Sequence, residues 1–384
     1  MKIKKSRVCF CGSGKEFRSC CKGRLNSKMD ISNNGLLDNP KQINNMMQQK
    51  YKSTDYRTCF HPGECDCKKP IKNAHTLQNN GVLSLISESG NVRVTNILNK
   101  ILEGTSTKEI RKTNATTFYG FCEYHDSVVF SEIENKPYIK TVEQNLLHAY
   151  RTCAQEYHKK NRELNIMQSV FKDNPSIYNM PGFVESYTNR ELSYNDVDEY
   201  MNIFNEALQC GDSDVLDSYV YAFDNVYDFA VTAMFNPTYD LRGKQLNDIY
   251  SQEDERLKSI FVSILPTKEC SYMIVSCLKE DSLHFKSYME QIKYLNEEDL
   301  KIFLNNLLPT YSENIVLSPR LWGRWTPFSR KEYERVVCGE IGEFDKLLSG
   351  EAPFGTLDEF EDGMFIKNGL NNMLRKAKYN LFKL

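Results

Sequence analysis

The sequence predicts an α+β protein made of several folded units. Its 384 residues exceed what one simple core usually holds. Cysteine and histidine clusters crowd its first third, while helical and strand-like patterns alternate in the rest. We therefore divide the chain into a cysteine-rich unit at 1–25, a polar linker at 26–50, a second Cys/His domain with a long helix at 51–172, and an α+β domain at 173–384.

Composition narrows the class of protein. Hydrophobic residues make up 40% and charged residues 26% of the chain, which is typical of globular proteins, and no long apolar run predicts a membrane span. The first residues are charged and lead into Cys9 and Cys11 rather than into the apolar segment of a secretory signal. We expect a cytoplasmic protein, in which most of the 13 cysteines are metal ligands or free thiols rather than disulfides.

Charge is distributed unevenly along the chain. Residues 1–28 carry nine basic side chains against Glu16 alone, a local charge of +8 in a chain of net charge −2. This asymmetry predicts that the N-terminus binds an anionic partner such as nucleic acid, anionic lipid or an acidic protein surface.

The first cysteine cluster has the spacing of a closed metal site. Cys9, Cys11, Cys20 and Cys21 form two close pairs separated by eight residues. Four thiolates suit a tetrahedral zinc ion with no open position. About 25 residues cannot bury enough apolar surface to fold alone, so we expect zinc, at about 10–16 kcal/mol of apparent binding free energy, to drive folding.

This segment resembles the SEC-C motif, a zinc-binding element found in many bacterial proteins. The resemblance covers residues 5–24 and includes the turn Gly12-Ser13-Gly14-Lys15; Phe10 departs from it, because the family usually has proline there. In the SecA translocation motor this motif contacts a chaperone and anionic lipid, so the resemblance implies an adaptor role. The chain contains no phosphate-binding loop of an ATP motor.

The second cluster predicts another zinc site, for which more than four residues are candidate ligands. A C-x5-C knuckle followed by a distant C-x2-H is typical of a treble-clef-like site with Cys59, Cys65, Cys122 and His125 as ligands. Three alternatives remain open at this point, because Cys67 can replace Cys65, and His61 or His75 can complete the site.

The order of these elements is similar to that of HNH-type nucleases over residues 55–130. The resemblance implies that His75, at the end of the first strand, is a general base that activates water against a phosphodiester. Ala74 departs from the family, which has a metal-binding residue before this histidine, and no second histidine follows the helix-borne knuckle. Asp126 or Glu132 can supply oxygen ligands for magnesium or manganese instead. In the alternative interpretation, His75 is not a general base but a structural ligand or a buried hydrogen-bonded side chain.

Apolar periodicity predicts the remaining elements. A buried stripe of period 3.6 predicts a long helix within residues 142–171, and another helix is expected at 192–208. Strands are expected at 226–235, 260–265 and 272–278, the last two as a hairpin, which together make a small antiparallel sheet. Helices expected to cover this sheet lie near 283–294, 297–308, 329–338 and 364–380.

Two functional hypotheses follow from these patterns. The leading one is a zinc-dependent adaptor whose basic N-terminus docks on an acidic protein surface or on nucleic acid. The alternative is an HNH-like metal-dependent nuclease with His75 as the base. The sequence predicts neither the partner nor the oligomeric state.

Overall fold

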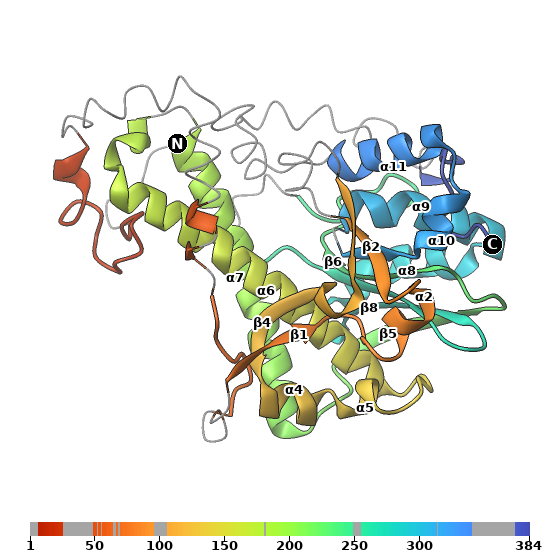
Figure 1. The fold of residues 1–384 in the computed structure, drawn as a ribbon. Coiled ribbons are helices and arrows are strands. Elements are labelled where there is room, and N and C mark those ends of the chain that lie inside the picture. The colour runs from red at the N-terminus through yellow and green to blue at the C-terminus, as the bar shows by residue number, and fades with distance from the viewer. Residues whose placement is uncertain are drawn as a thin grey trace. The chain divides into compact units, whose positions relative to one another are not determined.

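The structure of the protein is a computed structural model (Figure 1). It describes residues 7–25, 49–51, 53–54, 56–63, 67, 70–95, 106–179, 182–248, 255–312, 314–339 and 373–384. The chain forms two compact units, one from residues 1–56, 157–198 and 341–361 and the other from residues 57–156, 199–340 and 362–384. Each unit gathers segments that are far apart in the sequence, whereas the four parts expected above are contiguous; that four-part scheme stays a prediction.

The first unit combines the N-terminal cysteine segment with parts of two long helices. Its elements are the short 3-10 helix η1 (Lys22–Arg24), residues 157–173 of α6 (Val142–Asp173), the 3-10 helix η5 (Pro175–Asn179) and residues 183–198 of α7 (Phe183–Cys210). Buried side chains on α6 in this unit include Ile166, Met167, Val170 and Phe171, as the apolar stripe predicts.

The second unit is built on a seven-stranded sheet in which every neighbouring pair is antiparallel, in the order β3-β2-β9-β6-β7-β8-β5. Its strands are β2 (Asn91–Thr95), β3 (Thr107–Arg111), β5 (Leu216–Phe223), β6 (Phe229–Phe235), β7 (Ile260–Pro266), β8 (Ser271–Leu278) and β9 (Ile315–Leu317). The central strands are almost continuously apolar, because helices cover both faces of the sheet. Every residue of β7 is buried.

Different helices cover the two faces of this sheet. Helix α2 (Val82–Ile86) packs with Ala230, Leu265 and Val316 in one cluster of buried residues. Helices α8 (Ser282–Tyr294) and α9 (Glu297–Tyr311) present further buried apolar side chains, and α10 (Pro319–Arg324) and α11 (Pro327–Gly339) follow β9. The C-terminal segment joins this core through Phe382, whose ring lies 5.4 Å from that of Phe223.

A separate two-stranded sheet belongs to the same unit. Strand β1 (Ile71–His75) pairs antiparallel with β4 (Thr117–Cys122), with an irregularity between Lys72 and Ala74. Helices α4 (Glu123–Val129) and α5 (Ser131–Glu134) follow directly. The chain between β1 and β4 contributes α2, β2 and β3, so the hairpin is closed across a long insertion.

The α+β class and most of the expected elements are confirmed. The long helix α6 and the β7–β8 hairpin lie where periodicity predicts them. The sheet has seven strands rather than three, because β2, β3, β5 and β9 join it from distant segments. Most of the helix expected near 364–380 lies outside the described residues, and residues 374–380 form turns and irregular chain, where Asn305 binds the backbone of Tyr379 and Leu381.

No helix in the described ranges is both long enough and apolar enough to cross a membrane.

Candidate metal centres

The N-terminal cysteines are brought together by a tight loop. The backbone N–H of Cys9 donates to the carbonyl of Lys15 over 2.7 Å, and that of Phe17 donates to the carbonyl of Arg7 over 2.9 Å. Gly12 and Gly14 both have φ of +72°, in the left-handed region where glycine carries no steric penalty. These turns return the chain so that the first cysteine pair faces the second.

All four predicted ligands meet at one point. The sulfurs of Cys9, Cys11, Cys20 and Cys21 lie within 4.8 Å of one another, so the group can hold a metal ion. The Sγ of Cys20 lies 3.7 Å from that of Cys11 and 3.7 Å from that of Cys21. Cys9 and Cys21 are buried, and all four are free thiols.

The local environment shifts the pKa values of Cys9 and Cys11 in opposite directions. Burial raises the pKa of Cys9 well above its usual value. Burial also acts to raise the pKa of Cys11, but hydrogen bonds, first that from Ser13, outweigh it and lower this pKa to about 6. Metal ligation needs thiolates, so ion binding at this group would release protons and weaken in acid.

Aromatic side chains anchor this loop to its own unit. Phe10 is fully buried, and its ring lies 5.2 Å from that of Phe17 and 4.9 Å from that of Tyr187 on α7. Phe10 also contacts the rings of Phe171, Tyr178 and Phe183. The cysteine group therefore sits on a larger aromatic core, to which both long helices of this unit contribute.

Charged residues around the loop divide into anchored and exposed groups. The guanidinium of Arg7 lies 4.4 Å from the centroid of Phe10 and donates to the carboxylate of Glu191 over 2.9 Å. By contrast, Lys15, Arg18 and Lys22 are exposed. The loop thus presents a small basic surface, defined here as Lys15, Arg18 and Lys22, beside the cysteine group.

A second group that can hold a metal ion lies beside the β1–β4 hairpin. It consists of Cys59, Cys67, Cys122 and His125, whose ligand atoms all lie within 4.8 Å of one another. The Nδ1 of His125 is 3.3 Å from the Sγ of Cys59, 3.5 Å from that of Cys67 and 3.3 Å from that of Cys122. Three of the four predicted ligands are therefore together, with Cys67 as the fourth member. Cys65 lies outside the described residues.

Secondary structure positions these ligands. Cys122 ends β4 and caps α4, where its sulfur accepts the backbone N–H of His125 over 3.5 Å. The positive end of a helix favours a thiolate at this position. Burial raises the pKa of Cys59 to about 12, so this group too would lose protons on binding an ion. His61 stacks on the His125 ring with centroids 3.9 Å apart and holds it in place.

His75 lies at the end of β1 but joins neither ligand group among the described residues. Its Nδ1 donates to the carbonyl of Ala115 over 2.9 Å, and burial lowers its pKa. A neutral ring protonated on Nδ1 keeps a lone pair on Nε2. His75 therefore has the tautomer of a base or of a buried hydrogen-bonding group.

The carboxylates considered as divalent-ion ligands near His75 pair with cations of the chain. The Oδ1 of Asp126 lies 3.8 Å from the nearly buried guanidinium of Arg151, which also binds Glu134. Glu132 pairs with Lys136. Burial raises the pKa of Asp126 while Arg151 acts to lower it. These carboxylates need rearrangement before they can hold a divalent ion.

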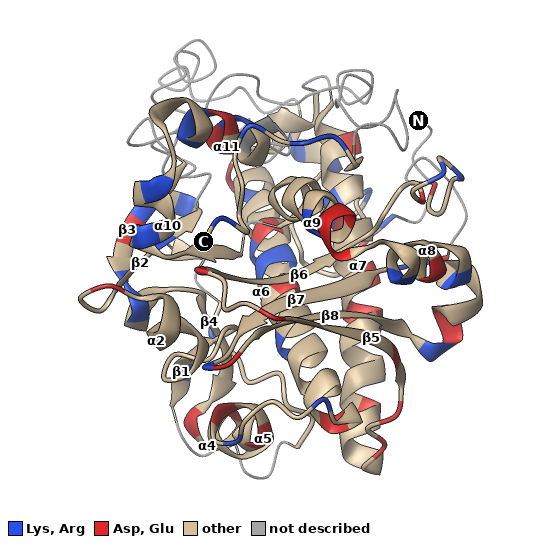
Figure 2. Cartoon of the chain, turned by 90° about the vertical axis from the view of Figure 1, so that its right-hand side faces the viewer, with Lys and Arg blue, Asp and Glu red and all other residues tan. Residues whose placement is uncertain are grey.

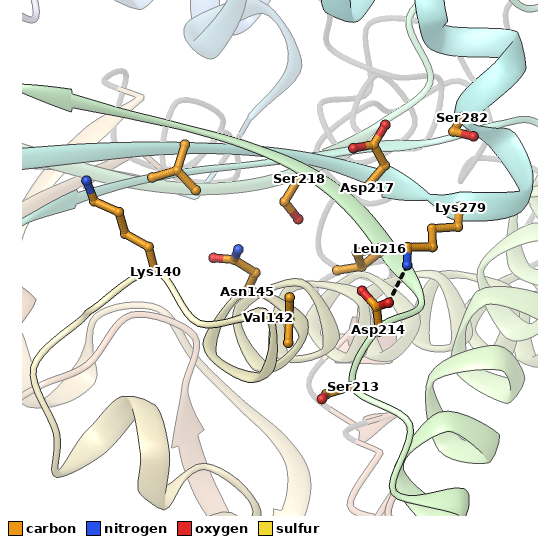
Figure 3. Close-up of a pocket in the computed structure, with 11 residues that line it drawn as sticks. Lys140, Val142, Asn145, Ser213, Asp214, Leu216, Asp217, Ser218, Lys279 and Ser282 are labelled. Carbon is orange, nitrogen blue, oxygen red and sulfur yellow. Dashed lines mark ion pairs between the residues drawn. The ribbon is translucent and has the colours of Figure 1, made fainter.

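A polar cavity of about 730 Å³ lies elsewhere in the second unit, between the start of α6 and the edge strand β5. Figure 3 shows Lys140 and Lys279 on opposite sides of it, with Asn145 and Ser218 between them. Lys279 is paired with Asp214 over 2.5 Å. No sequence motif indicates this cavity, because its lining comes from three separate segments, 140–145, 213–220 and 279–282.

No protein-family model, no curated protein and no solved structure matches this chain.

The aromatic residues that surround the first cysteine group were not predicted from the sequence. Its signal is present in hindsight as Phe171, Tyr178, Phe183 and Tyr187, which recur every four to seven residues across two helices and their connection.

Proposed function

We propose that the protein is a zinc-binding adaptor whose N-terminal SEC-C-like loop docks on an anionic partner, either an acidic protein surface or nucleic acid. The observation that carries the proposal is the placement of this loop. Its apolar side chains point into its own unit, and the basic surface of Lys15, Arg18 and Lys22 is left exposed. A binding module requires this division between an anchored side and a free charged side.

The spacing of the ligand atoms supports zinc. Four sulfurs at about 2.3 Å from a tetrahedral ion lie about 3.8 Å apart, and a sulfur and an imidazole nitrogen about 3.6 Å apart. The sulfur pairs at 3.7 Å fit the first value. The contacts of 3.3–3.5 Å between sulfur and the Nδ1 of His125 come close to the second. When bound, zinc would hold the loop and the hairpin in shape, and the protein residues would provide the recognition.

A binding experiment with matched variants tests the adaptor proposal. The variant Lys15→Gln/Arg18→Gln/Lys22→Gln should lose most capture of a polyanionic probe, tested separately with polyglutamate and with double-stranded DNA. Cys20→Ser should also lose capture, through unfolding of residues 7–25. The control Lys244→Gln/Lys268→Gln/Lys286→Gln removes the same charge from exposed positions of the second unit. If both triple variants capture the probes as the parent protein does, the N-terminal loop is not the docking site.

We also propose, as a second candidate, an HNH-like nuclease activity with His75 as general base. The specific observation in its favour is the hydrogen bond from Nδ1 of His75 to Ala115, which leaves Nε2 to accept a proton from water. The pairing of Asp126 with Arg151 weighs against a bound divalent ion.

The nuclease candidate has a direct test. His75→Ala should abolish nicking of plasmid DNA and cleavage of RNA in magnesium or manganese while zinc content stays unchanged. His75→Gln retains a hydrogen-bond donor towards Ala115 and should be equally inactive if the ring is the base. Absence of cleavage by the parent protein under these conditions removes this candidate.

A further inference from the structure

A second basic surface lies on the other unit and is independent of the N-terminal loop. We define this basic face by strands β2 and β3, helices α10 and α11 and residues 373–384. These segments carry twelve basic and three acidic side chains, a net charge of +9 in a chain of net charge −2. The remainder of the chain therefore has a net charge of −11, even though it includes the +8 of residues 1–28. Figure 2 shows blue residues gathered around α10 and the β2–β3 strands.

Most of these basic side chains are accessible. Ten of the twelve are exposed, and they come from all the segments of the face: Lys108, Arg111, Arg320, Arg324, Lys331, Arg335, Arg375, Lys376, Lys378 and Lys383. The segments contact one another, because the Nε1 of Trp325 donates to the carbonyl of Asn380 over 2.9 Å and Lys383 donates to the carbonyl of Arg324 over 2.8 Å. The strands join these helices through the hydrogen bond from Thr107 to Glu334 over 2.8 Å and through Arg93 over the Trp322 ring, so the segments of the face are neighbours in the second unit.

Nearby carboxylates order the face and offset part of its charge. Asp228, Glu88 and Glu298 pair with its basic side chains from outside the counted segments, which leaves a net charge of +6. Asp228 accepts from Arg320 over 2.8 Å and from Arg324 over 2.7 Å, so one negative charge holds two guanidinium groups side by side. Their side chains remain 41% and 37% exposed. Paired, pre-positioned guanidinium groups match the oxygens of a phosphate in bidentate geometry.

Aromatic rings are interleaved with these charges. Phe328 is 56% exposed, and the ammonium of Lys378 lies 5.1 Å from its ring centroid. Trp322 is half-buried, with the guanidinium of Arg93 at 4.7 Å and that of Arg330 at 5.5 Å from its ring. An exposed ring beside cations serves as a stacking platform for an unpaired base.

We propose that this basic face binds single-stranded nucleic acid. Extended positive charge tracks a phosphate backbone, and the exposed ring of Phe328 supplies base stacking that an acidic protein surface does not require. The proposal does not depend on the adaptor function of the N-terminal loop, because the two surfaces belong to different units.

The test measures binding of the full-length, metal-loaded protein to fluorescent dT20 and U20 by anisotropy between 50 and 300 mM salt. The variant Lys331→Gln/Lys376→Gln/Lys378→Gln should bind at least tenfold more weakly and flatten the salt slope by about 2, at about 0.7 per phosphate contact. Phe328→Ala should weaken binding by about fivefold to a hundredfold with an unchanged slope. Circular dichroism and thermal midpoints confirm that each variant is folded.

Two controls separate this proposal from the others. The variant Lys244→Gln/Lys268→Gln/Lys286→Gln removes the same charge from other exposed positions of this unit and should bind normally. The Lys15→Gln/Arg18→Gln/Lys22→Gln variant should also retain binding, even if it fails in the adaptor test. The proposal is overturned if the face variants bind dT20 and U20 like the parent. It is also overturned if the Lys15→Gln/Arg18→Gln/Lys22→Gln variant binds polyglutamate as tightly as dT20 and Phe328→Ala has no effect, which would indicate that an acidic protein binds this face.

Discussion

Phe10 connects the cysteine loop to its unit, at a position where the SEC-C motif that this segment resembles usually has proline. A proline there would fix φ but would not reach the aromatic cluster, whereas the Phe10 ring contacts Tyr187 at 4.9 Å and Phe171 at 5.4 Å. Arg7 covers the same ring at 4.4 Å. The loop is therefore held by packing as well as by any bound ion.

We predict that Phe10→Ala destabilises the first unit by about 3–5 kcal/mol, because it removes a fully buried ring and leaves a cavity. Metal content should not change, since no ligand is altered. Limited proteolysis should show faster cleavage within residues 7–25, and elemental analysis reports the metal. The matched control is Val8→Ala, two residues earlier in the same loop, which is 51% exposed and should behave like the parent. Loss of the metal from Phe10→Ala would instead mean that packing and ligation are inseparable.

At the level of single residues, the sequence predicts some members of the candidate sites and not others. The four N-terminal cysteines were predictable because their ligand geometry is local and two glycines allow the required turns. The place of Cys67 in the second group was not predictable, because one residue separates it from Cys65 and spacing favours neither. The stacking of His61 on His125 also comes from residues 64 positions apart, which no local pattern indicates.

At the scale of elements, a buried amide of α9 binds the backbone of the C-terminal segment at two points. Asn305 donates to the carbonyl of Tyr379 over 3.0 Å and accepts from the backbone N–H of Leu381 over 2.7 Å. It is 5% exposed, so these backbone groups have little access to water. This side chain replaces the regular hydrogen bonds that the segment would make as a helix.

We predict that Asn305→Ala destabilises the second unit by about 2–5 kcal/mol, because two buried backbone groups lose their partner at about 1–3 kcal/mol each. Urea denaturation measures the change, with Glu290→Ala on an exposed position of α8 as control. Binding of dT20 should also weaken, since Lys376 and Lys378 belong to the displaced segment. An unchanged urea midpoint would show that Phe382 and its neighbours hold the segment without Asn305.

Elements with strong periodicity were predictable, and those defined by distant pairing were not. Helix α6 follows its apolar stripe, and the β7–β8 hairpin follows two β-rich runs around a short turn. Strand β9 has only three residues, yet it pairs with both β2 and β6. Because β2 comes from a segment more than 200 residues away, the size of the sheet depends on contacts that local patterns do not encode.

At the scale of the whole molecule, the two candidate metal centres differ in how much folded structure surrounds them. The N-terminal group closes a segment of fewer than 25 residues whose regular structure is one 3-10 helix among the described residues. The second group lies beside a hairpin in a unit that also contains the seven-stranded sheet. We expect a segment without its own core to depend more on a bound ion for folding than a unit with a large core does.

We therefore predict two bound zinc ions per chain and an unequal response to their removal by a strong chelator. Residues 7–25 should become protease-sensitive, while the second unit should keep its cooperative thermal transition at a lower midpoint. Elemental analysis, mass mapping of the proteolytic fragments and calorimetry measure the three quantities, and added zinc should restore the parent behaviour. Cys20→Ser and Cys122→Ser, each expected to lose one ion, assign the effects to their centres. A metal-free protein with an intact N-terminal loop and an unshifted transition would show that neither centre contributes to folding.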